Sequence, residues 1–344
     1  MRPPSKLRRL EALIGAGAMA LTVTSCTSST RSPSSRPAQD RACAITAAPA
    51  GPVTIALKVA GSAPGTTGLL TAPVCVDGQG PFPFLVDTGQ AVSVISPTLA
   101  DRLHLHRSGK VSLGAVSCQA DTPAAAVASW SVGGLPLDTQ HLAVAPVPDT
   151  ELAQAPQGVL GSDVLGRFDA IRVGYRNDQL TMVAPEAALP AQPTLVRGAT
   201  RPVSAELVSG TPTAVVPLVV VQSAAGTLAS APVTLGRGHP TPFVVDSGSP
   251  TSSVGTSVAR FAHLAAAGTF GPAPGVGCPP SSAEVHSGPW AVGSLELPSM
   301  PLVRASDVTI AGQVIAGTVG TDVLARYGSF VLDYRSAQLI LGGR

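Results

Sequence analysis

Two short stretches of the sequence each place a carboxylate directly after an apolar run. Residues 84–96 read FLVDTGQAVSVIS, and residues 243–255 read FVVDSGSPTSSVG. In both, an Asp follows three apolar residues and precedes a hydroxyl residue and a glycine. Burying an unpaired charge is costly, so a carboxylate at the end of a strand-like run needs a compensating role. A single motif of this kind often marks only a turn. Two motifs in equivalent surroundings point instead to paired chemistry.

The chemistry open to such a pair is acid–base catalysis. Two carboxyl groups brought close together cannot both ionise at low cost, so they share one proton. One group then acts as a general base towards a water molecule, and the other as a general acid towards a carbonyl oxygen. This requires the fold to bring together Asp87 and Asp246, which lie in different halves of the chain.

An internal repeat provides the means. Residues 159–180, VLGSDVLGRFDAIRVGYRNDQL, match residues 318–339, TVGTDVLARYGSFVLDYRSAQL, at an offset of 159, which is also the offset between the two Asp positions. Self-similarity at a fixed offset indicates two copies of one structural unit. A pseudo-twofold axis between the copies would bring the two Asp residues together. We assign the copies to residues 51–186 and 206–344, joined by a Pro- and Ala-rich linker at 187–205.

Composition favours an all-β fold. The chain has 36 Gly and 33 Pro in 344 residues and is 44% hydrophobic, which supplies a core, while only 12% of its residues are charged. This mixture is typical of short strands with many turns. One short helix is expected at 162–168. Trp130 and Trp290 match at an offset of 160, and we predict core positions for both rather than a ligand-stacking role.

The N-terminal segment predicts export. Residues 1–25 have a basic start and an apolar stretch at 12–23, too short for a comfortable membrane span. The following VTSC resembles a bacterial lipobox, in which Cys26 would be lipidated and become the new N-terminus. An ordinary signal peptide with a chance cysteine is the alternative. Residues 26–50 are expected to form a flexible tether, so we predict an extracytoplasmic protein anchored to the membrane by lipid.

Charge gives no sign of a nucleic-acid partner. The N-terminal segment holds Arg2, Lys6, Arg8 and Arg9 against Glu11, so the formal charge of +2 becomes −1 when this segment is left out. A nucleic-acid-binding domain would carry a clear basic excess. The sequence therefore predicts no nucleic-acid partner.

The remaining cysteines predict disulfides. Cys43, Cys75, Cys118 and Cys278 are an even number in an exported chain, and they allow three connectivities. A zinc site is the weaker alternative, because no paired CxxC spacing exists. His104 and His106 are expected on the surface rather than as metal ligands. We expect no metal or other cofactor.

The paired motifs also resemble a known family. LVDTG with GVLGSDVL, and VVDSG with GTVGTDVL, are similar to the two signatures of retropepsin-like and pepsin-like aspartic proteases. The resemblance implies a bilobal acid-protease fold in which Asp87 and Asp246 are catalytic. It implies that the next hydroxyl residues bond across to the opposite loop and that the glycines permit a tight backbone; these are Thr88, Gly89, Ser247 and Gly248. The short copies look like retroviral-type subunits fused in tandem, as in domains attached to some mycobacterial surface proteins, so a monomer is expected.

The sequence departs from the family pattern in the loop and in the flaps. Gln90 stands where a small residue is usual, whereas Ser249 fits. The Gln90 amide would either hydrogen-bond the outer carboxylate oxygen and move the working pH, or crowd the site. Flap hairpins are expected at about 109–127 and 270–286, and neither has the Tyr of the pepsin flap.

Two disulfide arrangements follow from these flaps. Cys118 and Cys278 occupy equivalent flap positions, and equivalent residues meet only near the pseudo-twofold axis. One hypothesis is therefore a Cys118–Cys278 bridge between the flaps, which leaves Cys43 to pair with Cys75. The rival is a Cys75–Cys118 bridge within the first copy.

The sequence as a whole predicts an aspartic endopeptidase. Its polypeptide substrate would be hydrolysed by an activated water, without a metal or a covalent intermediate. The alternative is a catalytically inactive lipoprotein that binds peptides or scaffolds an envelope complex. Both Asp residues, both hydroxyl residues and both glycines are present, which favours the enzyme.

A single substitution tests the lipid anchor. We expect Cys26→Ser to block lipoprotein processing, because no thiol remains to be acylated, and to leave the signal segment attached. Intact mass and N-terminal sequencing of the membrane-extracted protein measure both effects against the unmodified chain. A mature N-terminus well beyond Cys26 that carries no lipid would contradict the anchor.

Overall fold

The computed structural model describes most of the chain beyond residue 42. The described residues are 43–46, 51–60, 68–115, 118–138, 141–147, 155–186, 188–190, 192–196, 207–208, 210–223, 226–275, 278–310 and 313–343. The predicted signal peptide, Cys26 and nearly all of the tether lie outside them. Within the described ranges, no helix is long and apolar enough to cross a membrane.

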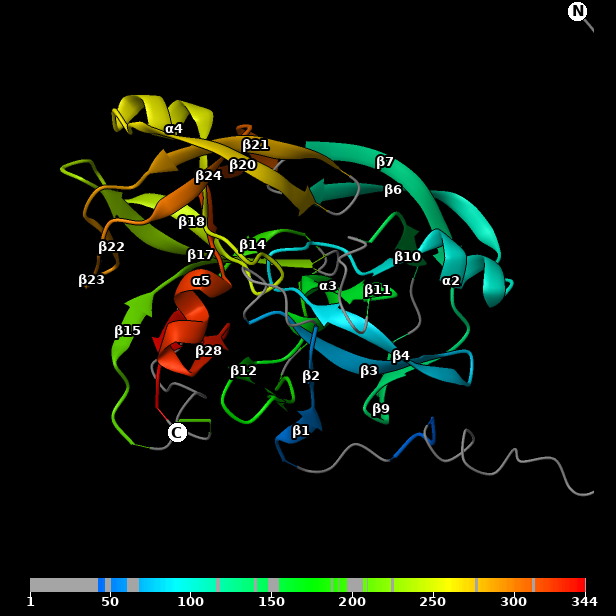
Figure 1. The fold of residues 1–344 in the computed structure, drawn as a ribbon. Helices are drawn as coiled ribbons and strands as arrows, with labels where there is room; N and C mark the ends of the chain where they lie inside the picture. Colours follow the sequence, from blue (N-terminus) through cyan, green and yellow to red (C-terminus); the bar gives the residue numbers. More distant parts are fainter. Residues whose placement is uncertain are drawn as a thin grey trace, which may run out of the picture. The chain divides into compact units, whose positions relative to one another are not determined.

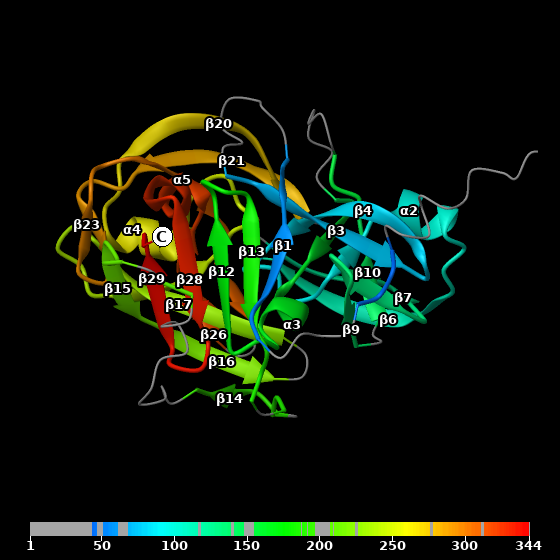
Figure 2. The same cartoon turned by 90° about the horizontal axis from the view of Figure 1, so that it is seen from below.

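A six-stranded sheet is built from strands of both copies (Figure 2). Its order is β1 (Val53–Ala56), β13 (Gln179–Val183), β12 (Ala170–Gly174), β28 (Ser329–Asp333), β29 (Gln338–Leu341) and β15 (Ala214–Pro217). The central strands β12 and β28 run antiparallel, and Arg172 pairs with Val331, its own repeat equivalent. A residue can pair with its equivalent only on the symmetry axis, so the pseudo-twofold axis passes between these strands.

Each copy also forms a larger sheet of its own (Figure 1). The first copy contributes β2 (Lys58–Val59), β3 (Leu70–Val76), β4 (Gln79–Val86), β5 (Val94–Ile95), β6 (Arg107–Ala115), β7 (Cys118–Ala126), β8 (Trp130–Val132), β9 (Leu135–Leu137), β10 (His141–Val144) and β11 (Gly158–Leu160). Along its path the order is β6-β7-β10-β5-β11-β4-β3-β8-β9.

The second copy repeats this order strand for strand in β20-β21-β24-β19-β27-β18-β17. Its strands are β16 (Val219–Ser223), β17 (Gly226–Leu235), β18 (Thr241–Val245), β19 (Ser253–Gly255), β20 (Ala266–Gly275), β21 (Cys278–His286), β22 (Trp290–Val292), β23 (Leu295–Leu297), β24 (Pro301–Ala305) and β27 (Gly317–Val319), with a small separate pair β25 (Val308–Ile310) and β26 (Gln313–Ile315). The predicted fold class, all-β with two pseudo-twofold-related units, is confirmed.

The helices are short and lie in equivalent places in the two copies. They are α2 (Pro97–Arg102), α3 (Ser162–Leu165), α4 (Thr256–Phe261), α5 (Thr321–Leu324) and the 3-10 turn η2 (Ala325–Tyr327). The Ser96 side chain caps α2 by accepting a hydrogen bond from Leu99 N, with Pro97 at the first helical position. The helix predicted at 162–168 is present as α3 but ends at Leu165.

Burial of single residues can be compared with the expectations from the sequence. Trp130 and Trp290 are buried, and each indole nitrogen donates to a backbone carbonyl eight residues ahead, so the predicted core role is confirmed. His104 and His106 are exposed, as expected. Within the predicted linker, strand β14 (Thr194–Leu195) pairs with β16. Leu207, farther along, packs with Ala170 and Val331 of the six-stranded sheet.

The two predicted flap hairpins are present as β6–β7 and β20–β21. Strands β7 and β21 come into contact with each other, and Figure 1 shows the hairpins approaching. Cys118 and Cys278 are the first residues of these two strands. Their side chains lie outside the described residues, and with them the hypothesis of a bridge between the flaps.

One disulfide is present among the described residues, between Cys43 and Cys75, with Cα atoms 5.7 Å apart. It ties the segment before β1 to strand β3. The pairing expected for these two cysteines is therefore confirmed, and the rival Cys75–Cys118 bridge is wrong because Cys75 is already bonded.

We expect Cys43→Ser with Cys75→Ser to lower the free energy of unfolding by about 3–4 kcal/mol, the chain-entropy value for a loop of this length. The bond closes a sequence separation of 32 residues. Urea unfolding measures the difference, and the reduced wild-type chain should match the double variant. Equal stability of oxidised and reduced protein would contradict a stabilising role.

Candidate active site

The two Asp residues of the repeated motif follow equivalent strands. Asp87 comes directly after β4, and Asp246 directly after β18. Each strand pairs in parallel with the Gly-containing strand of its own copy, β11 or β27. The ladder continues one step into each loop, because Asp87 N donates to Leu160 O at 3.1 Å and Asp246 N to Val319 O at 3.0 Å. The sheet of each copy therefore fixes the backbone position of its Asp residue.

The hydroxyl residues join the two loops by reciprocal hydrogen bonds. Thr88 Oγ1 donates to Val245 O at 2.7 Å, and Ser247 Oγ donates to Val86 O at 2.8 Å. Each hydroxyl also accepts from the opposite backbone: Ser247 N lies 3.1 Å from Thr88 Oγ1, and Thr88 N lies 3.2 Å from Ser247 Oγ. Both side chains are buried. The four bonds hold the loops of the two copies together at one place.

The two motif glycines are required by close approach. A Cβ on Gly89 would lie 2.5 Å from Cγ of Asp246, and a Cβ on Gly248 would lie 2.1 Å from Cγ of Asp87. Both distances are far inside van der Waals contact. Each loop therefore passes directly against the carboxyl group of the other, and a side chain at either glycine would push the carboxyl groups apart.

The carboxyl groups of Asp87 and Asp246 lie close together, and each shifts the pKa of the other. Oδ1 of Asp87 also accepts from Gly89 N and Gln90 N, both at 2.9 Å, and Oδ1 of Asp246 accepts from Gly248 N at 3.0 Å. Burial raises the pKa of Asp87. Burial, followed by the negative charge of Asp87, raises the pKa of Asp246 well above its usual value. The pair therefore retains a proton at a pH where isolated Asp side chains are ionised.

A buried Ser–Asp pair supports the first loop from below. Ser93 Oγ donates to Asp163 Oδ1 at 2.6 Å and accepts from Gly161 N at 2.9 Å. Asp163 lies at the start of the helix predicted at 162–168, where an Asp can act as an N-terminal cap. In the structure Gly161 is the N-cap of α3, no side chain caps this helix, and Asp163 serves the loop instead.

The second copy has the same support at the same offset. Ser252 Oγ donates to Asp322 Oδ1 at 2.7 Å and accepts from Gly320 N at 3.0 Å, while Ser252 N donates to Asp322 Oδ2 at 2.8 Å. The sequence signal that could have revealed this network is the recurrence of a Ser, a Gly and an Asp in both copies, each at the offset of the repeat.

The two positions after the motif glycines do not contact the carboxylates through their side chains. Gln90 is buried, and its Nε2 has no hydrogen-bond partner within the described ranges. The hydrogen bond expected from its amide to the outer carboxylate oxygen is therefore not formed. Ser249 Oγ donates to Thr251 O at 2.8 Å. Neither Asp carboxyl group therefore accepts a hydrogen bond from these two side chains, a bond that would lower its pKa.

Two tyrosines at repeat-equivalent positions have buried hydroxyls. The hydroxyls of Tyr175 and its repeat equivalent Tyr334 are buried and lack a partner in the part of the chain that the structure describes. Burial raises the pKa of both, and the charge of Asp246 raises that of Tyr175 further. Tyr175 is therefore close enough to Asp246 to feel its charge, a proximity that the sequence analysis missed although both tyrosines lie in the repeat.

A metal centre finds no support in the described ranges, because no three His, Cys, Asp or Glu side chains gather there as a metal ion would require. The chemical capacity of this site lies in the carboxyl pair.

A comparison with known protein families matches one segment of the first copy. Residues 72–164 match the sequence profile of a family described as aspartyl protease. No curated protein matches the chain. Among solved structures, a retropepsin-like aspartic protease from Rickettsia conorii matches with 19% identity and a TM-score of 0.27, over 39% of this chain and 91% of that chain.

The raised pKa of Asp246 predicts a pH-dependent stability difference. The folded protein holds this proton more tightly than the unfolded chain, whose Asp pKa is about 3.9, so wild-type stability falls as pH rises through the folded-state value. Asp246→Asn carries no such charge. We expect it to melt at a higher temperature than wild type at pH 7, with the difference shrinking below pH 4.

Calorimetric melting from pH 3 to pH 8 measures this effect. Glu296→Gln is the matched control, because it removes an exposed carboxylate of β23, and it should show no comparable stabilisation at pH 7. A lower melting temperature for Asp246→Asn at neutral pH would contradict a destabilising buried charge.

Proposed function

We propose that this chain is an aspartic endopeptidase that hydrolyses peptide bonds with a water molecule activated by Asp87 and Asp246. The close approach of their two carboxyl groups carries the proposal, because each motif glycine lies against the Asp of the other copy and each Asp shifts the pKa of the other. The aspartyl protease profile over residues 72–164 supports the same reaction class. Thr88, Gly89, Ser247 and Gly248 hold the pair in place, and Gln90 and Ser249 flank it.

The reaction needs one proton on the pair. The ionised carboxylate takes a proton from the water, and the water oxygen attacks the carbonyl carbon of the peptide. The protonated carboxyl gives its proton to the carbonyl oxygen, which yields a neutral tetrahedral intermediate. The proton taken from the water then passes to the amide nitrogen and the C–N bond breaks. As the carboxylic acid product forms, one hydroxyl of the intermediate returns its proton to the carboxylate that had acted as the acid. No covalent bond to the protein forms, and both carboxyl groups return to their starting state.

The two carboxyl groups have similar backbone donors. The N–H groups of Gly89 and Gln90 donate to Asp87, and those of Gly248 and Ser249 donate to Asp246; such bonds stabilise the ionised form. The two groups share one proton and titrate as one unit, so the base is whichever carboxyl group is ionised.

The substrate proposed is a polypeptide in an extended conformation. Two hairpins, β6–β7 and β20–β21, stand in equivalent positions in the two copies and meet through β7 and β21. An extended chain lying beneath both would present its peptide bonds to the carboxyl pair one after another. Because each copy has one flap, both copies would cover the bound substrate.

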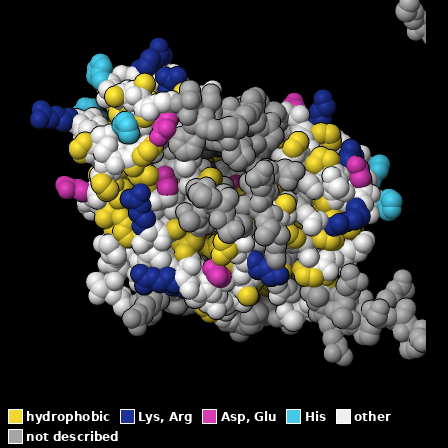
Figure 3. Space-filling model, viewed as in Figure 1, with side chains coloured by type: hydrophobic (Ala, Val, Ile, Leu, Met, Phe, Trp, Pro, Cys, Tyr) yellow, Lys and Arg dark blue, Asp and Glu magenta, His cyan; other side chains and the backbone are white. Residues whose placement is uncertain are grey.

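The cellular setting is proposed on separate grounds. An extracytoplasmic monomer anchored through lipid on Cys26 is consistent with the Cys43–Cys75 bond, because disulfides persist in oxidising compartments. On the face shown in Figure 3, the Lys and Arg side chains are dispersed rather than gathered into one patch. The described side chains of that face form no basic patch, in keeping with a polypeptide rather than a nucleic acid as partner.

We expect Asp87→Asn to abolish proteolysis and leave the fold intact, because an amide is nearly isosteric but cannot take a proton from water. Asp246→Asn should cost as much, and the double variant no more than either, since residues acting as a unit are not additive. Cleavage of a denatured protein by the full-length chain is the assay. Glu296→Gln, which alters an exposed side chain of β23 outside the loops and the flaps, should retain activity.

The pH profile is part of the same test. Activity should be bell-shaped and peak below neutrality, with its basic limb above the ordinary Asp range because burial raises both pKa values. Sustained cleavage by the double Asn variant would place the chemistry elsewhere. A folded wild-type chain that binds peptides but cleaves none would favour the inactive, peptide-binding alternative.

A further inference from the structure

Two arginines at repeat-equivalent positions meet different surroundings. Arg176 and Arg335 are separated by the offset of the repeat, and each directly follows one of the two tyrosines with a buried hydroxyl. Each backbone nitrogen donates to the opposite copy: Arg176 N to Gly328 O at 3.3 Å, and Arg335 N to Asp169 O at 3.2 Å. Gly328 is in turn the repeat equivalent of Asp169. The two side chains therefore leave the backbone from equivalent places, and their environments can be compared directly.

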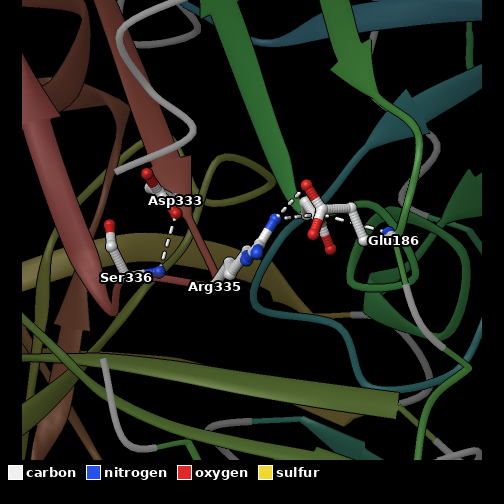
Figure 4. A network of polar contacts seen from close by, with 5 residues as sticks. Glu186, Asp333, Arg335 and Ser336 are labelled. Carbon is white, nitrogen blue, oxygen red and sulfur yellow. Dashed lines mark hydrogen bonds and ion pairs between the residues drawn. The ribbon is translucent and has the colours of Figure 1, made fainter. Parts of the chain in front are cut away.

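The charge of Arg335 is met by two carboxylates of the chain itself. Its Nη1 lies 2.6 Å from Oε1 of Glu186 and 3.4 Å from Oδ2 of Asp169 (Figure 4). Glu186 N also donates to Asp169 Oδ2 at 3.2 Å. A cavity of ≈ 300 Å³ adjoins this cluster, and Phe168 and the prolines Pro185 and Pro190 help to line it. This arginine therefore already holds an acidic, proline-containing segment.

The charge of Arg176 is not met in this way. Glycine at 328 removes the carboxylate that Asp169 provides in the other copy. A Cβ there would lie 2.3 Å from Nε of Arg176, so the guanidinium rests against the glycine backbone. Arg176 is exposed, and its side chain has no hydrogen bond or ion pair with any other described residue.

A cavity stands open at this arginine. It measures ≈ 410 Å³ and is lined by Arg176, Thr211, Thr213, Tyr327 and three glycines. Tyr327 is the repeat equivalent of Phe168, so an aromatic ring lines both cavities. Among the described residues, no carboxylate lines this one. The cavity thus has the arginine and the ring of its counterpart, and in place of the counterpart's acidic groups it has two threonines.

We propose that the Arg176 cavity is a docking site for an acidic, extended peptide. A Glu or Asp side chain of that peptide pairs with Arg176 as Glu186 pairs with Arg335, through a charge-assisted hydrogen bond. Tyr327 offers its ring to the neighbouring apolar residues, and Thr211 and Thr213 offer hydroxyls to the peptide backbone. The site uses no residue of the carboxyl pair or its loops, so binding there can be tested independently of peptidase activity.

Because Arg176 is exposed, binding there should weaken steeply with salt. The probe is a fluorescein-labelled synthetic peptide with the sequence of residues 184–195, APEAALPAQPTL. Its twin carries Gln in place of Glu. Fluorescence polarisation is measured on the full-length chain carrying Asp87→Asn, so that the probe is not cleaved.

We expect the Gln twin to bind at least tenfold more weakly than the Glu peptide. Arg176→Gln should produce the same loss, whereas Arg176→Lys, which keeps the charge, should retain most of the affinity. Arg260→Gln is the matched control, because it removes an exposed arginine of α4, and it should bind like the parent. Each variant is checked for an unchanged melting temperature.

Three results would overturn the proposal. The first is equal affinity of Arg176→Gln and its parent for the Glu peptide. The second is loss of binding with Arg335→Gln but not with Arg176→Gln, which would show that the probe displaces the chain's own linker. The third is competition by free acetate at the concentration at which the peptide binds, which would identify a small-anion site.

Discussion

The reciprocal hydrogen bonds between Thr88 and Ser247 are the interaction on which the rest of the structure depends. Each hydroxyl donates to a carbonyl at the end of the opposite strand and accepts from the opposite backbone. Two carboxyl groups that lie close together tend to separate when both ionise, and a loop held only by its own copy could move away. Bonds that cross between the copies oppose that movement. The glycines beside them let the loops close without a Cβ in the way.

Hydrogen bonds from two buried serines and the six-stranded sheet support the two Asp loops. Ser93 and Ser252 each connect a loop to the turn that begins α3 or α5, and the six-stranded sheet carries the pseudo-twofold axis between β12 and β28. Burial alone would favour two neutral carboxyl groups, whereas the N–H groups around Asp87 favour its ionised form. One shared proton satisfies both tendencies. The phenol of Tyr175 cannot take up the negative charge instead, because burial and the nearby Asp246 raise its own pKa.

The features that were predictable from sequence are those that a repeat or a local pattern encodes. The two copies, the all-β class and the buried Trp130 follow from composition and matched spacing, and the flap hairpins from the family resemblance. Features that depend on which atoms meet in space were not predictable. Asp163 has the sequence position of a helix cap, but Ser93, 70 residues away, is its partner. Gln90 is close to the carboxylate in sequence, yet burial leaves its Nε2 without a partner among the described residues. The linker has the composition of a loop, yet Thr194 pairs with a strand that forms only in the folded protein.

Joining the two copies in one chain explains why the symmetry is broken where it is. In a homodimer, a substitution changes both halves of the site at once, so the two carboxyl loops and the two arginines would have to remain identical. In a single chain each position changes alone. Gly328 opposite Asp169 leaves one arginine neutralised by the chain's own carboxylates and the other open to solvent. Glu186 lies where the first copy runs into the linker, so the covalent connection supplies one of the two carboxylates that neutralise Arg335.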